Sequence, residues 1–208
     1  MKIQRIDTYN DTRFNGDVLK QHGAYLIDDE YPCQFLIKGI DSATVYYHDY
    51  DNISEIIDEF RFYTKHISKF YDKDNTLIKS YDEIKLLKIN IDKLQPSQFY
   101  ISSEKLENIA TWAKTPEDFI IPVLRREDET IILDGHTRLY LAKKLNIKEV
   151  YVYDDYSDEH IWGFVGEAKN RNIYTISDLE PVSDEDYAGL WHKYCDEYFA
   201  KIDNYFSN

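Results

Sequence analysis

The amino-acid sequence of 208 residues predicts an α+β protein. Three observations lead to this prediction. Residues 1–83 hold short runs of β-branched and aromatic residues, with one helical pattern after them. Strand and helix patterns alternate over residues 84–155, and helical periodicity dominates residues 156–208. We therefore expect an N-terminal β-meander plus helix extension, a mixed sheet-and-helix core and a helical C-terminal cap, packed as one compact unit.

The meander is predicted from three runs, at residues 24–28, 34–38 and 44–47. Their β-branched and aromatic side chains are typical of strands. Turn-forming residues separate the runs, at 28–32 and 39–42. Each run is therefore expected to form one strand.

A helix is predicted directly after the meander. Asn52, followed three residues later by Glu55, is the sequence pattern of a capping box. One helical face of this segment is apolar, formed by Ile53, Ile56, Ile57, Phe60, Ile67 and Phe70. No residue type in the first 80 residues indicates a chemical function.

The core segment begins with a half-buried strand over residues 86–92, which Pro96 ends. Ser102 is placed to cap a helix. Further strands are predicted at 120–124, 130–133 and 150–153, with a helix at 136–146. In the C-terminal cap, Ser157 and Ser183 are expected to begin two helices, the second with an acidic first turn.

The composition restricts the class of partner. Subtracting 39 acidic from 25 basic residues gives a net charge of −14, so the chain is repelled by nucleic-acid phosphates, and nucleic acid is not the expected partner. The N-terminal sequence shows no signal peptide, and the most apolar run, residues 119–124, is too short to span a bilayer. Cys33 and Cys195 are expected to be reduced thiols. We expect a cytoplasmic protein with no membrane partner.

One segment carries candidate chemistry, residues 134–138, which read Asp-Gly-His-Thr-Arg between a predicted strand and a helix. Unpaired amides at a helix start form an anion site, and Gly135 lets a ligand approach the backbone. Thr137 adds a hydroxyl, and Arg138 adds a planar cation suited to phosphate. Asp134 can hold a metal ion or accept a proton, and His136 can donate to phosphate or carry a proton. The simpler alternative is a structural turn with a solvated arginine, because glycine turns before helices are common.

The order of elements around this turn is more specific than the turn itself. The first part is a strand ending in Lys-Leu-Gln-Pro-Ser-Gln at 93–98, followed by a helix after Ser102. The second part is a strand with the sequence Ile-Pro-Val-Leu at 121–124. The turn sequence Leu-Asp-Gly-His-Thr-Arg at 133–138 and a strand at 149–152 complete the order. With these parts, about a third of the chain resembles the N-terminal domain of the ParB/sulfiredoxin-like superfamily. A weaker likeness follows at Glu167, Asn170 and Arg171, which match the segment that closes the nucleotide site in ParB proteins.

The resemblance implies a nucleotide-binding protein, with ATP, ADP or CTP held together with Mg²⁺. Gly135, His136, Thr137 and Arg138 would contact the phosphates, with Asn170 and Arg171 closing the site. Sulfiredoxins carry a cysteine in the turn and partition proteins a Gly-Glu-Arg-Arg sequence, and this chain has neither. The turn is most similar to the Asp-Gly-His-His-Arg of the free-serine kinases, with Thr137 in place of the second histidine.

The kinase resemblance implies a small-molecule phosphotransferase in which Asp134 and His136 are catalytic. Those kinases use a glutamate where this chain has Gln98, which cannot act as a base. Gln98 and Glu167 are therefore assigned only as substrate or metal contacts. A non-catalytic interaction or regulatory module stays open as the alternative, and a DNA-associated partition or nuclease role is disfavoured by the charge. His192 and Cys195 are three residues apart, but zinc sites need more protein ligands, so no protein-only metal site is expected.

Overall fold

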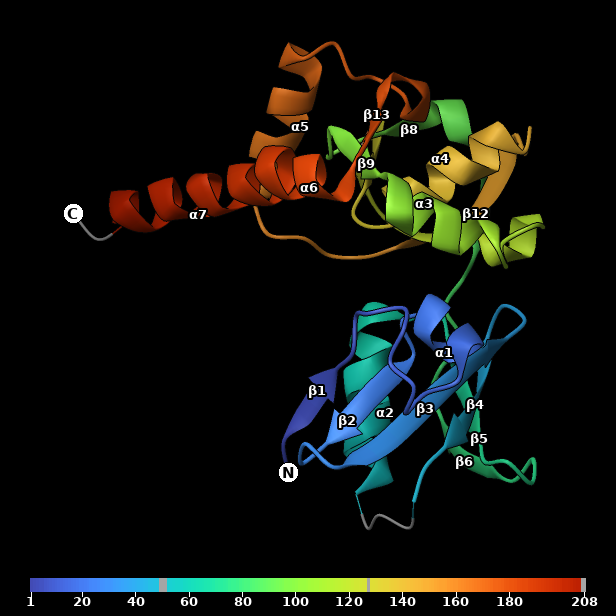
Figure 1. Cartoon of the computed structure of the whole chain (residues 1–208). Coiled ribbons are helices and arrows are strands. Elements are labelled where there is room, and N and C mark those ends of the chain that lie inside the picture. The colour runs from blue at the N-terminus through green and yellow to red at the C-terminus, as the bar shows by residue number, and fades with distance from the viewer. Residues whose placement is uncertain (49–51, 127, 207–208) are drawn as a thin grey trace. The chain divides into compact units, whose positions relative to one another are not determined.

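The structure is a computed structural model that describes residues 1–48, 52–126 and 128–206. Its contacts divide the chain into two compact units, Met1–Leu86 and Leu87–Asn208, here called the N-terminal and C-terminal units (Figure 1). Both units combine strands with helices, so the α+β class is confirmed. The expectation that the whole chain forms one compact unit is wrong. The chain has two units, because each sheet buries its apolar side chains in a core of its own.

The N-terminal unit is built on one sheet with the strand order β1-β2-β3-β4-β5-β6. Its strands are Ile3–Arg5 (β1), Ala24–Ile27 (β2), Tyr31–Lys38 (β3), Ser42–Tyr46 (β4), Lys69–Tyr71 (β5) and Leu77–Ser80 (β6), and its helices are Gly16–Lys20 (α1) and Ile53–Tyr63 (α2). Strands β2, β3 and β4 form the predicted meander, but β3 begins at Tyr31, inside the predicted turn segment 28–32, because Tyr31 and Pro32 pair with β2. Strand β5 runs parallel to β4, because helix α2 connects them as a crossover.

The core of the N-terminal unit lies between α2 and the sheet. Phe60 of α2 stacks on Phe35 of β3 with the ring centroids 4.2 Å apart. The predicted helix is too long, since α2 ends at Tyr63 and Phe70 lies on β5. Ile67 and Phe70 are fully buried in the same core, so their apolar character reflects burial in the sheet and not a helical face. The start of α2 also differs, because the Asn52 side chain makes no capping hydrogen bond.

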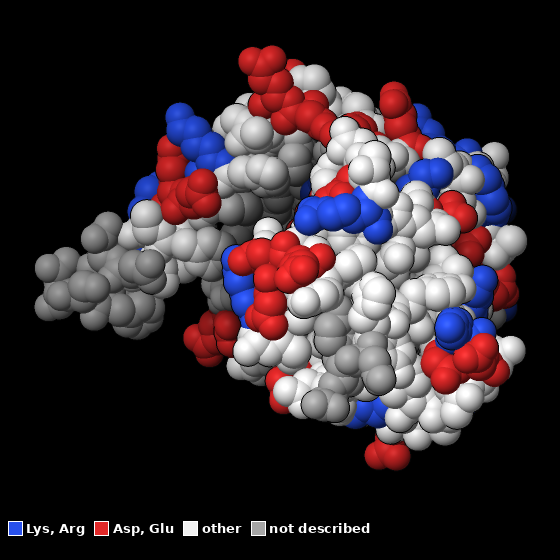
Figure 2. Space-filling model, turned by 60° about the horizontal axis from the view of Figure 1, so that its bottom comes forward, with Lys and Arg blue, Asp and Glu red and all other residues white. Residues whose placement is uncertain are grey.

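Charged side chains on the N-terminal unit form local pairs. Lys79 contacts Asp58 at 2.9 Å, and Lys69 contacts both Asp41 and Glu83 at 2.8 and 2.7 Å. Figure 2 shows basic and acidic side chains interspersed over one face of the molecule. This mixture gives that face no strong field of either sign.

The C-terminal unit contains a five-stranded mixed sheet with the order β7-β12-β10-β11-β8 and a two-stranded parallel sheet of β13 and β9. The strands are Leu87–Asn90 (β7), Leu94–Gln95 (β8), Tyr100–Ser102 (β9), Ile120–Arg126 (β10), Glu129–Ile132 (β11), Glu149–Asp154 (β12) and Glu180–Val182 (β13). The α-helices are Ser103–Ala110 (α3), His136–Lys144 (α4), Ile161–Asn170 (α5), Asp184–Tyr187 (α6) and Lys193–Phe206 (α7), with a π-helical turn, Ala188–His192, between the last two.

Two predicted helix starts in this unit are confirmed by their hydrogen bonds. The Ser102 hydroxyl accepts from the backbone N–H of Lys105 at 3.1 Å, and the Ser183 hydroxyl accepts from that of Asp186 at 3.1 Å. Each hydroxyl satisfies one amide that the first helical turn leaves without a partner.

Three other expectations for this unit need correction. The strand predicted at 86–92 ends at Asn90, whose side chain accepts from the N–H of Asp92 and begins a 3-10 turn. Ser157 does not cap a helix, since α5 starts after His160. The C-terminal segment is not entirely helical, because β13 pairs with β9. The segment predicted as the cap lies in the same compact unit as the core.

Candidate functional site

The turn between β11 and α4 requires glycine. Gly135 has a φ of +89°, in the left-handed region that L side chains rarely adopt. A Cβ atom there would lie 2.7 Å from Cδ1 of Ile121 and 3.0 Å from Nη2 of Arg138. The backbone at Gly135 is therefore covered by the Arg138 guanidinium, and a larger residue would displace it.

Helix α4 begins directly after this glycine with features that favour an anion. Gly135 provides no side-chain cap, and the first turn of α4 contains no acidic residue. The N–H groups of a first helical turn carry partial positive charge. The N-terminus of α4 is therefore a place where the oxygens of a phosphate would be stabilised.

Arg138 lies over the turn and makes two hydrogen bonds. Its Nη2 donates to Oδ2 of Asp134 at 3.1 Å, and its Nη1 donates to the carbonyl of Ile120 at 3.1 Å. The Asp134 side chain is 74% exposed, whereas that of Arg138 is 23% exposed. An ion pair with so exposed a partner contributes only about 0–1 kcal/mol, so an incoming phosphate can compete for the guanidinium.

His136 lies inside the unit, only 4% exposed. Its Nε2 accepts a hydrogen bond from the backbone N–H of Ser97 at 3.1 Å, which places the ring proton of the neutral form on Nδ1. Burial lowers the pKa of His136 to about 4, although the charge of Asp134 acts in the opposite direction. His136 is therefore neutral near pH 7, and this hydrogen bond attaches the segment after Pro96 to the start of α4.

Ser97 is a residue of this site that the sequence did not single out. Its hydroxyl donates to the carbonyl of Ile132 at 2.7 Å, at the end of β11, while its N–H contacts His136. The only available signal was its position after Pro96 in the segment that carries the family resemblance. A serine in a loop does not by itself predict such a contact.

Gln98 is held in one orientation by two acceptors. Its Nε2 donates to the carbonyl of Tyr100 at 2.5 Å and to the hydroxyl of Tyr187 at 2.9 Å. A backbone carbonyl only accepts, so the nitrogen must point toward it. Both amide hydrogens are used, and the Gln98 carbonyl oxygen remains as an acceptor. Tyr187, the last residue of α6, is thereby brought to the candidate site.

Three predicted residues lie at the end of α5. Arg171 Nε donates to Oε1 of Glu167 at 2.8 Å, and Arg171 Nη1 donates to the hydroxyl of Tyr100 at 3.3 Å. The guanidinium also lies 4.5 Å from the centre of the Phe99 ring. Asn170 is exposed and is the last residue of α5.

Residues 97–100 connect these predicted positions. Ser97 contacts His136, and Tyr100 contacts Arg171. Two parts of the chain that the sequence proposed separately, residues 134–138 and 167–171, therefore meet the same short segment. Ser97 and Tyr187 extend the set that the sequence singled out.

The other candidate side chains give no metal centre. Within the described residues, no three His, Cys, Asp or Glu side chains are grouped so that they could hold a metal ion. Burial raises the pKa of the Cys195 thiol to about 11, and His192 packs against the ring of Tyr187. Burial likewise raises the pKa of Cys33 to about 12. Both thiols are protonated near pH 7, so neither is a reactive thiolate.

Over the described residues, no helix has the length and apolar character needed to cross a bilayer.

Comparisons with known proteins leave the family open. No protein-family model matches the sequence, and no curated protein matches it. Among solved structures, the chain is similar to "protein Atu1540 from Agrobacterium tumefaciens", with a TM-score of 0.36 and 23% sequence identity. That match covers 52% of this chain and 68% of the other. A likeness at this level supports no statement about fold family or activity.

Proposed function

We propose that the C-terminal unit binds a nucleotide through its phosphates at residues 134–138. The observation that carries this proposal is the N-terminus of α4, where Gly135 has no side chain to cap the helix, beside the Arg138 guanidinium. A helix N-terminus and a planar cation at one turn provide amide donors and charge for the same phosphate oxygens. The family resemblance of this segment points to the same ligand, ATP, ADP or CTP.

In this proposal, each group at the turn has a distinct role. The backbone N–H groups at the start of α4 and the Thr137 hydroxyl donate to phosphate oxygens, and Arg138 neutralises their charge. The exposed Asp134 carboxylate is an oxygen ligand of the kind that Mg²⁺ prefers, and it fits the ion that accompanies a nucleotide. Asn170 and Arg171 would close the site from α5.

The residues favour binding over phosphoryl transfer. Gln98 cannot remove a proton, and burial makes His136 a poor base. Asp134 is the one remaining carboxylate of the turn that could accept a proton from a substrate hydroxyl. A nucleotide-regulated interaction module is therefore the leading form of the proposal, and a small-molecule phosphotransferase is the second form.

Thermal unfolding with ATP, ADP and CTP, each with Mg²⁺, tests the binding. A nucleotide present at about 100 times its dissociation constant should stabilise the unit that binds it by roughly 2.7 kcal/mol. Arg138→Ala should abolish this stabilisation. Arg125→Ala is the matched control, since Arg125 pairs with Asp154 away from the turn. Absence of stabilisation by all three nucleotides would refute the proposal.

A measurement of ATP turnover distinguishes the regulatory module from the phosphotransferase. Incubation with ATP, Mg²⁺ and a panel of hydroxy-amino acids should leave ATP intact if the unit is a regulatory module. Formation of ADP that depends on the amino acid and is lost in Asp134→Asn would establish the phosphotransferase instead.

A further inference from the structure

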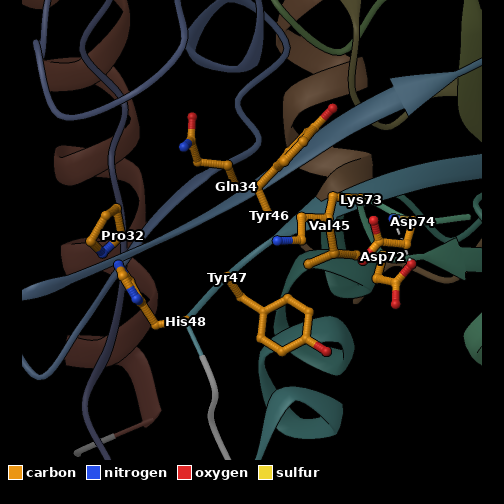
Figure 3. Close-up of a pocket in the computed structure, with 9 residues that line it drawn as sticks. All are labelled: Pro32, Gln34, Val45, Tyr46, Tyr47, His48, Asp72, Lys73 and Asp74. Carbon is orange, nitrogen blue, oxygen red and sulfur yellow. Dashed lines mark hydrogen bonds between the residues drawn. The ribbon is translucent and has the colours of Figure 1, made fainter. Parts of the chain in front are cut away.

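A second candidate site lies in the N-terminal unit and includes none of the residues discussed for nucleotide binding. An open cavity of about 430 Å³ is bounded by β3, by the end of β4 and by the hairpin that joins β5 to β6 (Figure 3). Cavities of this size hold small organic ligands. The side chains that line it determine the class of ligand.

One boundary of the cavity is a cross-strand pair on the sheet. Gln34 of β3 lies directly opposite Tyr46 of β4 in the strand register. Oε1 of Gln34 accepts from the backbone N–H of Asn15 at 2.7 Å, which fixes the amide orientation. The Nε2 hydrogens of Gln34 are therefore the group that can donate to a ligand.

Aromatic rings line the cavity beside this pair. Tyr46 is 40% exposed, so its ring is accessible. Tyr47 packs against the core of the unit and His48 contacts the ring of Tyr31, which restrains both side chains. An aromatic face carries partial negative charge and attracts the weakly positive C–H groups of a ring placed on it.

The hairpin between β5 and β6 provides the charged groups. Oδ1 of Asp72 accepts from the N–H groups of Asp74 and Thr76, both at 2.8 Å, so the turn is fixed by its own side chain. Lys73 extends from this turn toward the two tyrosines, with Asp72 and Asp74 beside it (Figure 3). The cavity thus offers both donors and acceptors, with carboxylates in excess.

We propose that this cavity binds an uncharged polyhydroxylated ring, that is, one residue of a sugar. A sugar ring has a C–H face for Tyr46 and hydroxyl groups that both donate and accept. A phosphate would meet two carboxylates and one ammonium, and a wholly apolar ligand would desolvate Lys73 and Asp74 without compensation. The proposal is independent of nucleotide binding, because it concerns the other unit.

Saturation-transfer NMR on the full chain, with affinities from calorimetry, tests this proposal. The probes are glucose, galactose, mannose and N-acetylglucosamine, with glucose 6-phosphate and indole as an anionic and an apolar comparison. At least one neutral sugar should bind. Tyr46→Ala should weaken its binding about tenfold, the size expected for losing an aromatic contact.

A second variant removes donors without removing the structural contact. Gln34→Glu keeps an oxygen for the N–H of Asn15 but loses the Nε2 hydrogens, and should also weaken sugar binding. Phe62→Ala is the control, because Phe62 is 68% exposed and does not line the cavity. Failure of every neutral sugar to bind, tighter binding of indole or the phosphate, or equal binding by Tyr46→Ala and Phe62→Ala would each overturn the proposal.

Discussion

The backbone N–H of Ser97 and Nε2 of His136 are joined by a hydrogen bond of 3.1 Å across 39 residues of sequence. This contact attaches the segment after Pro96 to the first residue of α4. Because the imidazole is buried and must remain neutral to accept, the geometry of the candidate site depends on the protonation of one ring.

The first prediction concerns pH. Burial lowers the folded-state pKa of His136 from 6.5 to about 4, so the unfolded chain binds a proton more readily between these values. The unfolding free energy should therefore be fully retained above pH 6.5 and decrease as the pH falls toward 4, by roughly 3 kcal/mol. Urea denaturation at a series of pH values measures this.

Two matched variants test whether His136 is the side chain responsible for this pH dependence. His136→Gln should flatten this part of the pH profile, whereas His192→Gln, at an exposed position of the same unit, should leave it unchanged. A profile that is equally steep in wild type and His136→Gln would contradict the assignment.

The second prediction concerns the glycine of the turn. Gly135→Ala should lower the unfolding free energy by about 1–3 kcal/mol, because its φ is positive and its Cβ would contact Ile121. Gly166→Ala, in α5, is the control: a Cβ there meets nothing within 4 Å, and helical alanine stabilises by about 0.5–1 kcal/mol. In urea denaturation, Gly135→Ala should lower the unfolding free energy and Gly166→Ala should raise it. Equal changes in the two variants would contradict a strained backbone at Gly135.

The third prediction concerns the hydrogen bond between Gln98 and Tyr187. Tyr187→Phe removes the acceptor for one amide hydrogen and should cost about 1 kcal/mol of stability. In a double-mutant cycle with Gln98→Ala, the two changes should be coupled by a similar amount. Additive effects within error would mean that the Tyr187 hydroxyl, at the end of α6, does not hold Gln98.

The fourth prediction concerns the start of α3. Ser102→Ala loses the cap on Lys105 and the hydrogen bond that the hydroxyl donates to Asp184 at 2.6 Å. We expect a loss of about 1–2 kcal/mol. Ser103→Ala, one residue along in the same helix, should change stability by less than about 0.5 kcal/mol. The difference between the two variants is the measured quantity.

The elements most accurately predicted from sequence are those with local signals. Ser102 and Ser183 cap helices because a hydroxyl and the amide it accepts from lie three residues apart, which a sequence pattern can reveal. The β-meander was likewise visible, since its strands are separated by turn residues. These signals do not depend on distant parts of the chain.

The errors arise where distant contacts decide the structure. Ile67 and Phe70 fit the spacing of a helical face, yet β5 pairs with β4, whose paired residues lie 27 positions earlier in the chain. Burial alone does not distinguish a helix from a strand over so short a run. The contact of Ser97 with His136 was invisible for the same reason, because it depends on β8 lying beside β11.

The division of the chain at Leu86 has a consequence for cooperativity. Two separate cores permit two separate melting transitions. A single midpoint temperature would then average the unfolding of the N-terminal unit with that of the C-terminal unit. A nucleotide should displace only the transition of the C-terminal unit, and a sugar only that of the N-terminal unit. Calorimetry can thus report which half of the polypeptide a compound has engaged before any residue is altered.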